Sequence, residues 1–93
     1  MAADLKEKAT RYRSLLKEAL DDAKKAPGMG PELERTADEF YGMAKSYYLD
    51  GVHFLEAGDL VNALVCFSYG HAWLDAGVRL GVFRTTKKDL FAA

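Results

Sequence analysis

The fold is decided by one short stretch of the chain, Leu55-Glu56-Ala57-Gly58-Asp59-Leu60, which separates two long runs of helix-forming residues. Gly58 can adopt the left-handed backbone conformation that closes a helix. Asp59 can accept hydrogen bonds from backbone N–H groups and so open the next helix. Because the connection is so short, it predicts two antiparallel helices packed side by side.

On both sides of this turn the apolar residues recur at steps of three and four, the period of one helical face. Upstream, this spacing predicts a helix over about residues 31–57, in which Pro31 takes the first position, where its missing N–H costs nothing. Downstream, a helix is predicted over about residues 59–80. The expected buried stripe of the upstream helix consists of Leu33, Ala37, Phe40, Ala44, Tyr47, Gly51 and Phe54.

A further helix is predicted at the start of the chain, over about residues 4–25, from the same apolar period. Asp4 and Glu7 have the form of a capping pair, and Lys24 and Lys25 would place positive charge on the last carbonyls of the helix. Residues 26–30 are predicted to form a loop, and residues 81–93 a short tail. The sequence therefore predicts a single all-α domain over residues 1–93, an up-down-up three-helix bundle with a tight hairpin.

The helix predicted over residues 59–80 is apolar on two faces, and two neighbouring helices in so small a bundle can cover only one of them. The second face must be covered by the tail or by another chain. Because two-fold homodimers are the commonest assemblies, we favour a homodimer over a different protein partner. The predicted interface consists of Val65, Tyr69, Ala72, Trp73, Ala76 and Leu80.

The composition argues against several functional classes. The net charge is −1, from 13 basic and 14 acidic residues, so nucleic acid is disfavoured as a partner. A single cysteine, Cys66, and a start without the apolar core of a signal peptide predict a cytoplasmic protein. The longest apolar stretch, residues 60–74, is shorter than the roughly 20 residues that a membrane span needs. We expect no membrane association and no cofactor.

Asp50 and His71 are the strongest candidates for chemistry. Pairing the two helices about the turn places them about 6 Å apart along the axis, at 1.5 Å per residue. A carboxylate at this position could orient the imidazole for acid–base catalysis. His53 and Asp75 each lie about 10 Å or more from the opposite partner by the same rise, so four metal ligands do not converge.

A structural interpretation of the same residues competes with the catalytic one. In it, His71 is a core histidine that bonds to Asp50, Asp75 or a tyrosine hydroxyl, and Asp75 pairs with Arg79 one turn further on. No nucleophile accompanies Asp50 and His71, and Cys66 is expected to be an inert buried thiol. We prefer the structural interpretation.

Two resemblances bear on the hairpin. The stretch from Ala44 to Gly77 is similar to one 34-residue tetratricopeptide repeat, but at least about three repeats are needed for a stable array. The similarity therefore describes how the two helices pack and implies no peptide-binding groove.

The second resemblance depends on many residues in a fixed order. The run Tyr47-Tyr48-Leu49-Asp50-Gly51-Val52-His53-Phe54-Leu55-Glu56-Ala57-Gly58-Asp59-Leu60-Val61-Asn62-Ala63-Leu64, followed by Phe67-Ser68-Tyr69-Gly70-His71-Ala72-Trp73-Leu74-Asp75-Ala76-Gly77, resembles the archaeal family of unknown function numbered 357, DUF357. The resemblance covers roughly the second half of the chain. It implies a short three-helix protein from an archaeon, and it implies no activity or cofactor.

Two hypotheses of function remain. The leading one is a non-enzymatic helical module that associates with itself or with another protein through the second apolar face of the helix over residues 59–80. The alternative is a small hydrolase or metal-dependent enzyme centred on Asp50 and His71.

Overall fold

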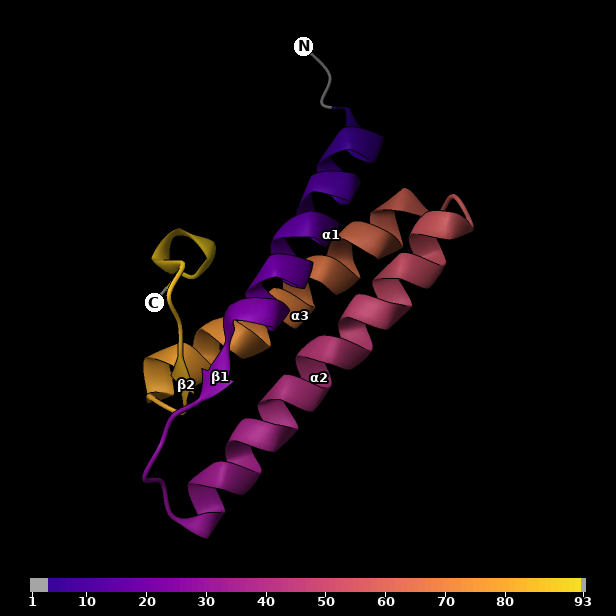
Figure 1. Ribbon diagram of the computed structural model, residues 1–93. Helices are drawn as coiled ribbons and strands as arrows, with labels where there is room; N and C mark the ends of the chain where they lie inside the picture. The colour runs from indigo at the N-terminus through magenta and orange to yellow at the C-terminus, as the bar shows by residue number, and fades with distance from the viewer. Residues whose placement is uncertain (1–3, 93) are drawn as a thin grey trace.

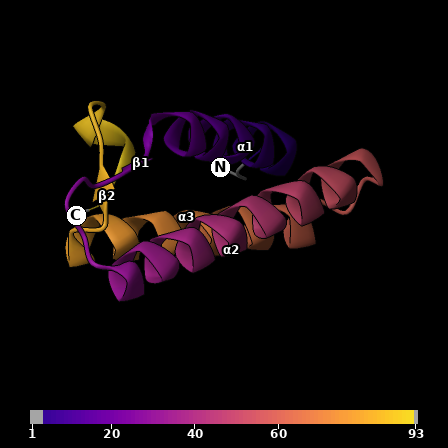
Figure 2. The same ribbon diagram turned by 60° about the horizontal axis from the view of Figure 1, so that its bottom comes forward.

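In the computed structural model, which describes residues 4–92, the chain folds into three α-helices. They are α1 (Leu5–Asp22), α2 (Pro31–Glu56) and α3 (Leu60–Leu80). The α2–α3 hairpin forms one layer, and α1 packs on one side of it, in contact with both helices (Figures 1 and 2). Two short strands, β1 (Lys24–Lys25) and β2 (Phe83–Arg84), and one 3-10 turn, η1 (Lys88–Leu90), complete the fold. The predicted three-helix bundle is confirmed.

The turn between α2 and α3 has the predicted geometry. Gly58 has a φ of +80°, and the N–H groups of Gly58 and Asp59 donate to the carbonyls of Leu55 and Phe54 at 3.1 and 2.9 Å. The Asp59 carboxylate then accepts the backbone N–H of Asn62 at 3.2 Å. These bonds satisfy the free carbonyls at the end of α2 and the free N–H groups at the start of α3, so the direction of the chain reverses within a few residues.

Small residues set the register of the hairpin. Gly51 of α2 lies against the ring of Phe67 in α3, and Gly70 of α3 lies against Tyr47 and the backbone of Ala44. This is the register expected when the two helices are paired about the turn. A side chain at either glycine would push the helices apart, so these positions allow the close approach that buries Phe67.

Helix α1 ends three residues earlier than predicted. Its last residue is Asp22, and the backbone is already extended at Ala23, with a ψ of 123°. Lys24 and Lys25 pair antiparallel with Arg84 and Phe83. The prediction that both lysines lie in the last helical turn is therefore wrong, because a strand partner near the other end of the chain takes up their backbone groups.

The core lies between the three helices. Its largest fully buried side chains are Phe67, Leu16, Leu74 and Val82. The predicted stripe of α2 faces this core at Ala37, Ala44 and Gly51, but Leu33 is exposed. Leu33 lies in the first turn of α2, which extends past the end of α1 (Figure 1), so no helix covers it there.

The tail returns over the end of α1. The Asp22 carboxylate accepts the backbone N–H groups of Thr86 and Lys87 at 2.9 and 3.0 Å, together with the Thr86 hydroxyl. Phe83 and Phe91, on either side of this contact, are buried. Asp22 therefore fastens the tail between two apolar anchors.

The Asp22 contact predicts a pH dependence. The Thr86 hydroxyl bond and the Lys87 N–H bond lower the pKa of the Asp22 carboxyl. The stabilisation that the ionised Asp22 carboxylate gives the folded state is therefore complete above the unfolded-state pKa of about 3.9. It is lost as the pH falls through the lower folded-state pKa. We expect Asp22→Asn to melt below the wild type at neutral pH, and the gap to narrow as the pH falls below about 4. Thermal melts followed by circular dichroism across this range measure the gap. A gap that stays constant would contradict the assignment.

Candidate interaction surface

One face of α3 carries exposed apolar side chains along its whole length. Val61, Val65, Tyr69 and Leu80 are 61%, 58%, 50% and 55% exposed, and the sequence from Leu60 to Leu74 contains no Asp, Glu, Lys or Arg. Of the predicted interface, Ala72 and Ala76 are also exposed, whereas Trp73 is half-buried at the border with α2. The exposed residues form what we call the α3 stripe: Val61, Val65, Tyr69, Ala72, Ala76 and Leu80.

The tail leaves the α3 stripe open and follows another flank of the helix. The Nε2–H of His71 donates to the Leu90 carbonyl at 2.6 Å, and the Asp75 carboxylate accepts the backbone N–H of Ala92 at 3.0 Å. The ring of Phe91 lies 6.1 Å from that of His71. The sequence left two possible covers for the second apolar face of α3, the tail or another chain. The tail covers the side of α3 that carries His71 and does not cover the α3 stripe.

Aromatic contacts hold the centre of the stripe in place. The Tyr69 ring meets Tyr47 of α2 at 4.7 Å and Trp73 at 6.3 Å between centroids, and Trp73 meets Phe40 of α2 at 5.1 Å. Edge-to-face contacts of this kind are worth about 0.5–1.5 kcal/mol each. They fix Tyr69 although half of it is exposed, so little side-chain freedom remains to be lost when a partner binds.

Two large open hollows are among those that flank these aromatic residues. The hollow on the stripe itself has a volume of about 520 Å³ and is lined by Leu64, Val65, Ser68, Tyr69 and Ala72. The hollow between α2 and α3 has a volume of about 590 Å³ and is lined by Glu39, Phe40, Gly42, Met43, Ser46 and Trp73. The buried indole N–H of Trp73 has no hydrogen-bond partner within residues 4–92. Both hollows are suited to apolar side chains, because neither gathers the polar groups that orient a reacting ligand.

Asp50 and His71 are not joined in this structure. Asp50 is exposed on α2, and within the described residues no hydrogen bond or ion pair links it to His71, which instead bonds to Leu90. The expected bond of His71 to Asp50, Asp75 or a tyrosine is therefore wrong, as is the Asp75–Arg79 pair, since Asp75 binds Ala92. Helical spacing could not predict either bond, because Leu90 and Ala92, the partners of His71 and Asp75, both lie in the tail.

The described residues meet the requirements of neither a metal site nor a reactive thiol. Among residues 4–92, no three His, Cys, Asp or Glu side chains lie close enough together to hold a metal ion. Burial raises the pKa of the Cys66 thiol, and the carboxylates of Asp50 and Asp59 raise it further. A thiol in such surroundings stays protonated at neutral pH and is a poor nucleophile.

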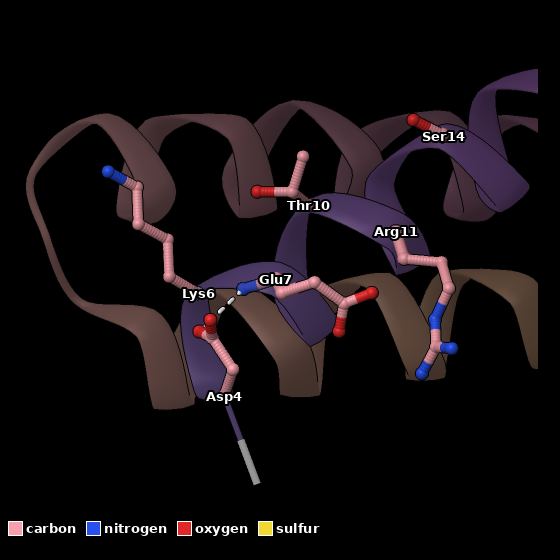
Figure 3. A pocket seen from close by; sticks show the side chains of 6 residues that line it. All are labelled: Asp4, Lys6, Glu7, Thr10, Arg11 and Ser14. Atoms are coloured by element: carbon pink, nitrogen blue, oxygen red, sulfur yellow. Dashed lines mark hydrogen bonds between the residues drawn. The ribbon is translucent and has the colours of Figure 1, made fainter.

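A third hollow, of about 460 Å³, lies on the first turns of α1 (Figure 3) and is lined by Asp4, Lys6, Glu7, Thr10, Arg11 and Ser14. The Asp4 carboxylate accepts the Glu7 N–H at 3.0 Å, which is the predicted cap. The side chains of Lys6 and Arg11 point away from each other (Figure 3). Because these charges have both signs and do not converge, the hollow has the character of a solvated helix face.

No helix within residues 4–92 combines the length and the apolar character needed to cross a membrane.

Comparisons with known proteins identify the family. A family model described as "Protein of unknown function (DUF357)" matches residues 11–83, which include most of α1 and all of the hairpin. The chain also resembles the crystal structure of a DUF357 protein from Archaeoglobus fulgidus, with a TM-score of 0.72 and 24% identity over 89% of this chain and 95% of that one. At this identity the likeness shows the fold alone. No curated protein matches the chain. Because the family match extends over most of its length, the chain belongs to the DUF357 family.

Proposed function

We propose that this small helical protein is a non-enzymatic module that associates through the α3 stripe, with a second copy of itself as the favoured partner and another protein as the alternative. One observation carries the proposal, the row of large apolar side chains at Val61, Val65, Tyr69 and Leu80, each at least half exposed. Contiguous apolar surface of this kind marks interaction sites, whereas scattered apolar residues do not.

The chemistry of the stripe supports binding over catalysis. Since residues 60–74 contain no Asp, Glu, Lys or Arg, burying this face against a partner removes no carboxylate, ammonium or guanidinium group of that segment from water. Tyr69 supplies the large, rigid anchor that is typical of interface centres.

The single cysteine, Cys66, fits a reducing compartment, so we propose that the module acts in the cytoplasm.

Val65→Glu is expected to weaken self-association by at least about a hundredfold, because an unpaired carboxylate buried in an apolar interface costs several kcal/mol. Sedimentation equilibrium from low to high micromolar concentration measures this change. Wild-type protein is expected to shift from monomer to dimer over that range, while the variant stays monomeric. Val65 is 58% exposed in the single chain, so the substitution leaves the fold intact.

Leu49→Glu is the matched control. Leu49 is 57% exposed on α2, outside the α3 stripe. This variant is expected to dimerise like the wild type. The proposal of self-association through the α3 stripe is wrong if wild-type protein remains monomeric over the whole concentration range. It is also wrong if Val65→Glu and Leu49→Glu lower the sedimentation mass equally.

A further inference from the structure

The order of large and small residues along the α3 stripe distinguishes two ways in which a second copy can pack on it. In a parallel pair, each residue meets its own equivalent, so Tyr69 opposes Tyr69 and Ala72 opposes Ala72. In an antiparallel pair centred on the middle of the stripe, Tyr69 opposes Ala72. The full antiparallel set is Val61 with Leu80, Val65 with Ala76, and Tyr69 with Ala72.

Packing favours the antiparallel pair. Between its end residues Val61 and Leu80, the stripe carries large side chains at Val65 and Tyr69 and small ones at Ala72 and Ala76. Antiparallel pairing places Val65 and Tyr69 each against an alanine, at the interaxial distance of about 8–10 Å that packed helices share. Val61 meets Leu80 at the two ends of the contact. Parallel pairing sets two half-exposed tyrosine rings against each other and leaves the alanines facing across a gap, which forfeits contacts.

The charge at the end of α3 favours the same arrangement. Arg79 is five helical turns from Val61 and so lies on the same face. It is exposed and forms no ion pair within residues 4–92. Antiparallel pairing sets Arg79 opposite Asn62, about 4.5 Å along the axis from Asp59. Parallel pairing would set Arg79 against the Arg79 of the other copy and align the two helix dipoles unfavourably.

We propose that the chain forms a two-fold dimer in which two α3 stripes pack antiparallel, with Val65 of each copy on Ala76 of the other and Tyr69 on Ala72. This geometry rests on the proposed self-association and specifies the partner and its register. From Val61 to Leu80 the contact is about 28 Å long and one helix wide. It therefore lies at the small end of stable interfaces, which bury about 800 Å² per copy, and we expect a dissociation constant in the micromolar range.

Disulfide cross-linking tests the register. In a Cys66→Ala background, the double variant Val65→Cys/Ala76→Cys is expected to convert to a covalent dimer under mild oxidation. The single variants Val65→Cys and Ala76→Cys are the matched controls. In the antiparallel pair each introduced cysteine lies about 16 Å along the axis from its own equivalent, beyond the roughly 7 Å limit between Cα atoms. The single variants should therefore remain monomeric on non-reducing gels.

Each other outcome has a distinct meaning. Rapid cross-linking by Val65→Cys alone indicates a parallel pair and overturns the geometry, while self-association stands. A double variant that cross-links no faster than Leu49→Cys/Ala76→Cys, when the wild type sediments as a dimer, also overturns the geometry. A wild type that sediments only as a monomer overturns the proposed function itself.

A charge-pair rescue avoids replacing the buried Cys66. Val65→Glu is expected to be monomeric, and adding Ala76→Lys should restore dimerisation, because each glutamate then meets a lysine of the other copy. The two positions are three turns apart within one chain, so they cannot pair internally. Val65→Glu with Leu49→Lys carries the same net charge and should stay monomeric. Equal recovery in both double variants, or in neither, contradicts the register.

Discussion

Replacing Phe67 with alanine is expected to lower the free energy of unfolding by about 3–5 kcal/mol. The Phe67 ring is 1% exposed, lies against Gly51 of α2, and sits 6.1 Å from the ring of Tyr48. It belongs to the same core cluster as Leu16 of α1. Its removal therefore leaves a cavity in the core that the three helices share.

Urea unfolding followed by circular dichroism measures the loss, at low protein concentration so that dimerisation does not contribute. Since small domains are stable by only about 5–15 kcal/mol, Phe67→Leu, which keeps most of the apolar volume, provides an intermediate value in case the alanine variant is largely unfolded. Leu49→Ala is the surface control and should change stability by no more than about 0.5 kcal/mol. An equal effect of Phe67→Ala and Leu49→Ala would mean that Phe67 does not link the helices.

The hairpin could be predicted because its determinants are local. Gly58 and Asp59 stand next to each other, and the register follows once the direction of the chain reverses there. The helical period of α2 and α3 needed only short-range spacing. Gly51 and Gly70 then appear opposite a ring and a backbone, which is the arrangement that this register requires.

The features that the sequence did not predict depend on contacts between distant parts of the chain. Helix α1 ends at Asp22 because Lys24 and Lys25 pair with β2, and His71 takes its bond from Leu90. The tail has no helical or strand period that would indicate where it docks. Helical spacing within α3 could place His71 on a flank, but it could not identify the carbonyl that satisfies it.

The candidate surface lies between these two cases. An excess of apolar residues on α3 was visible in the sequence, because a small bundle cannot cover every face. Which side of α3 the tail covers could not be predicted from the sequence. Val61 was missed as a stripe residue, although it stands four residues before Val65 and repeats its spacing. The choice of a second copy as occupant remains a proposal.

Gly77→Ala is expected to destabilise the protein by about 1–3 kcal/mol, although alanine is the better helix former. A Cβ at Gly77 would overlap the buried ring of Phe83. Phe83 belongs to β2 and pairs with Lys25 of β1, so the ring can move only by disturbing that pairing. We therefore expect faster hydrogen exchange at the backbone amides of β1 and β2, and a lower melting temperature.

Gly42→Ala is the matched control, because it makes the same chemical change inside a helix without the steric conflict. Gly42 is exposed on α2, and no heavy atom outside its own helical surroundings lies within 4 Å of the position that a Cβ would take. Alanine there is expected to raise stability by about 0.5–1 kcal/mol through helix propensity alone. A loss of stability in Gly77→Ala together with a gain in Gly42→Ala would thus distinguish the effect of packing from that of helix propensity. If Gly77→Ala stabilised the protein as Gly42→Ala does, Phe83 could not be seated against α3, and the tail would have to dock elsewhere.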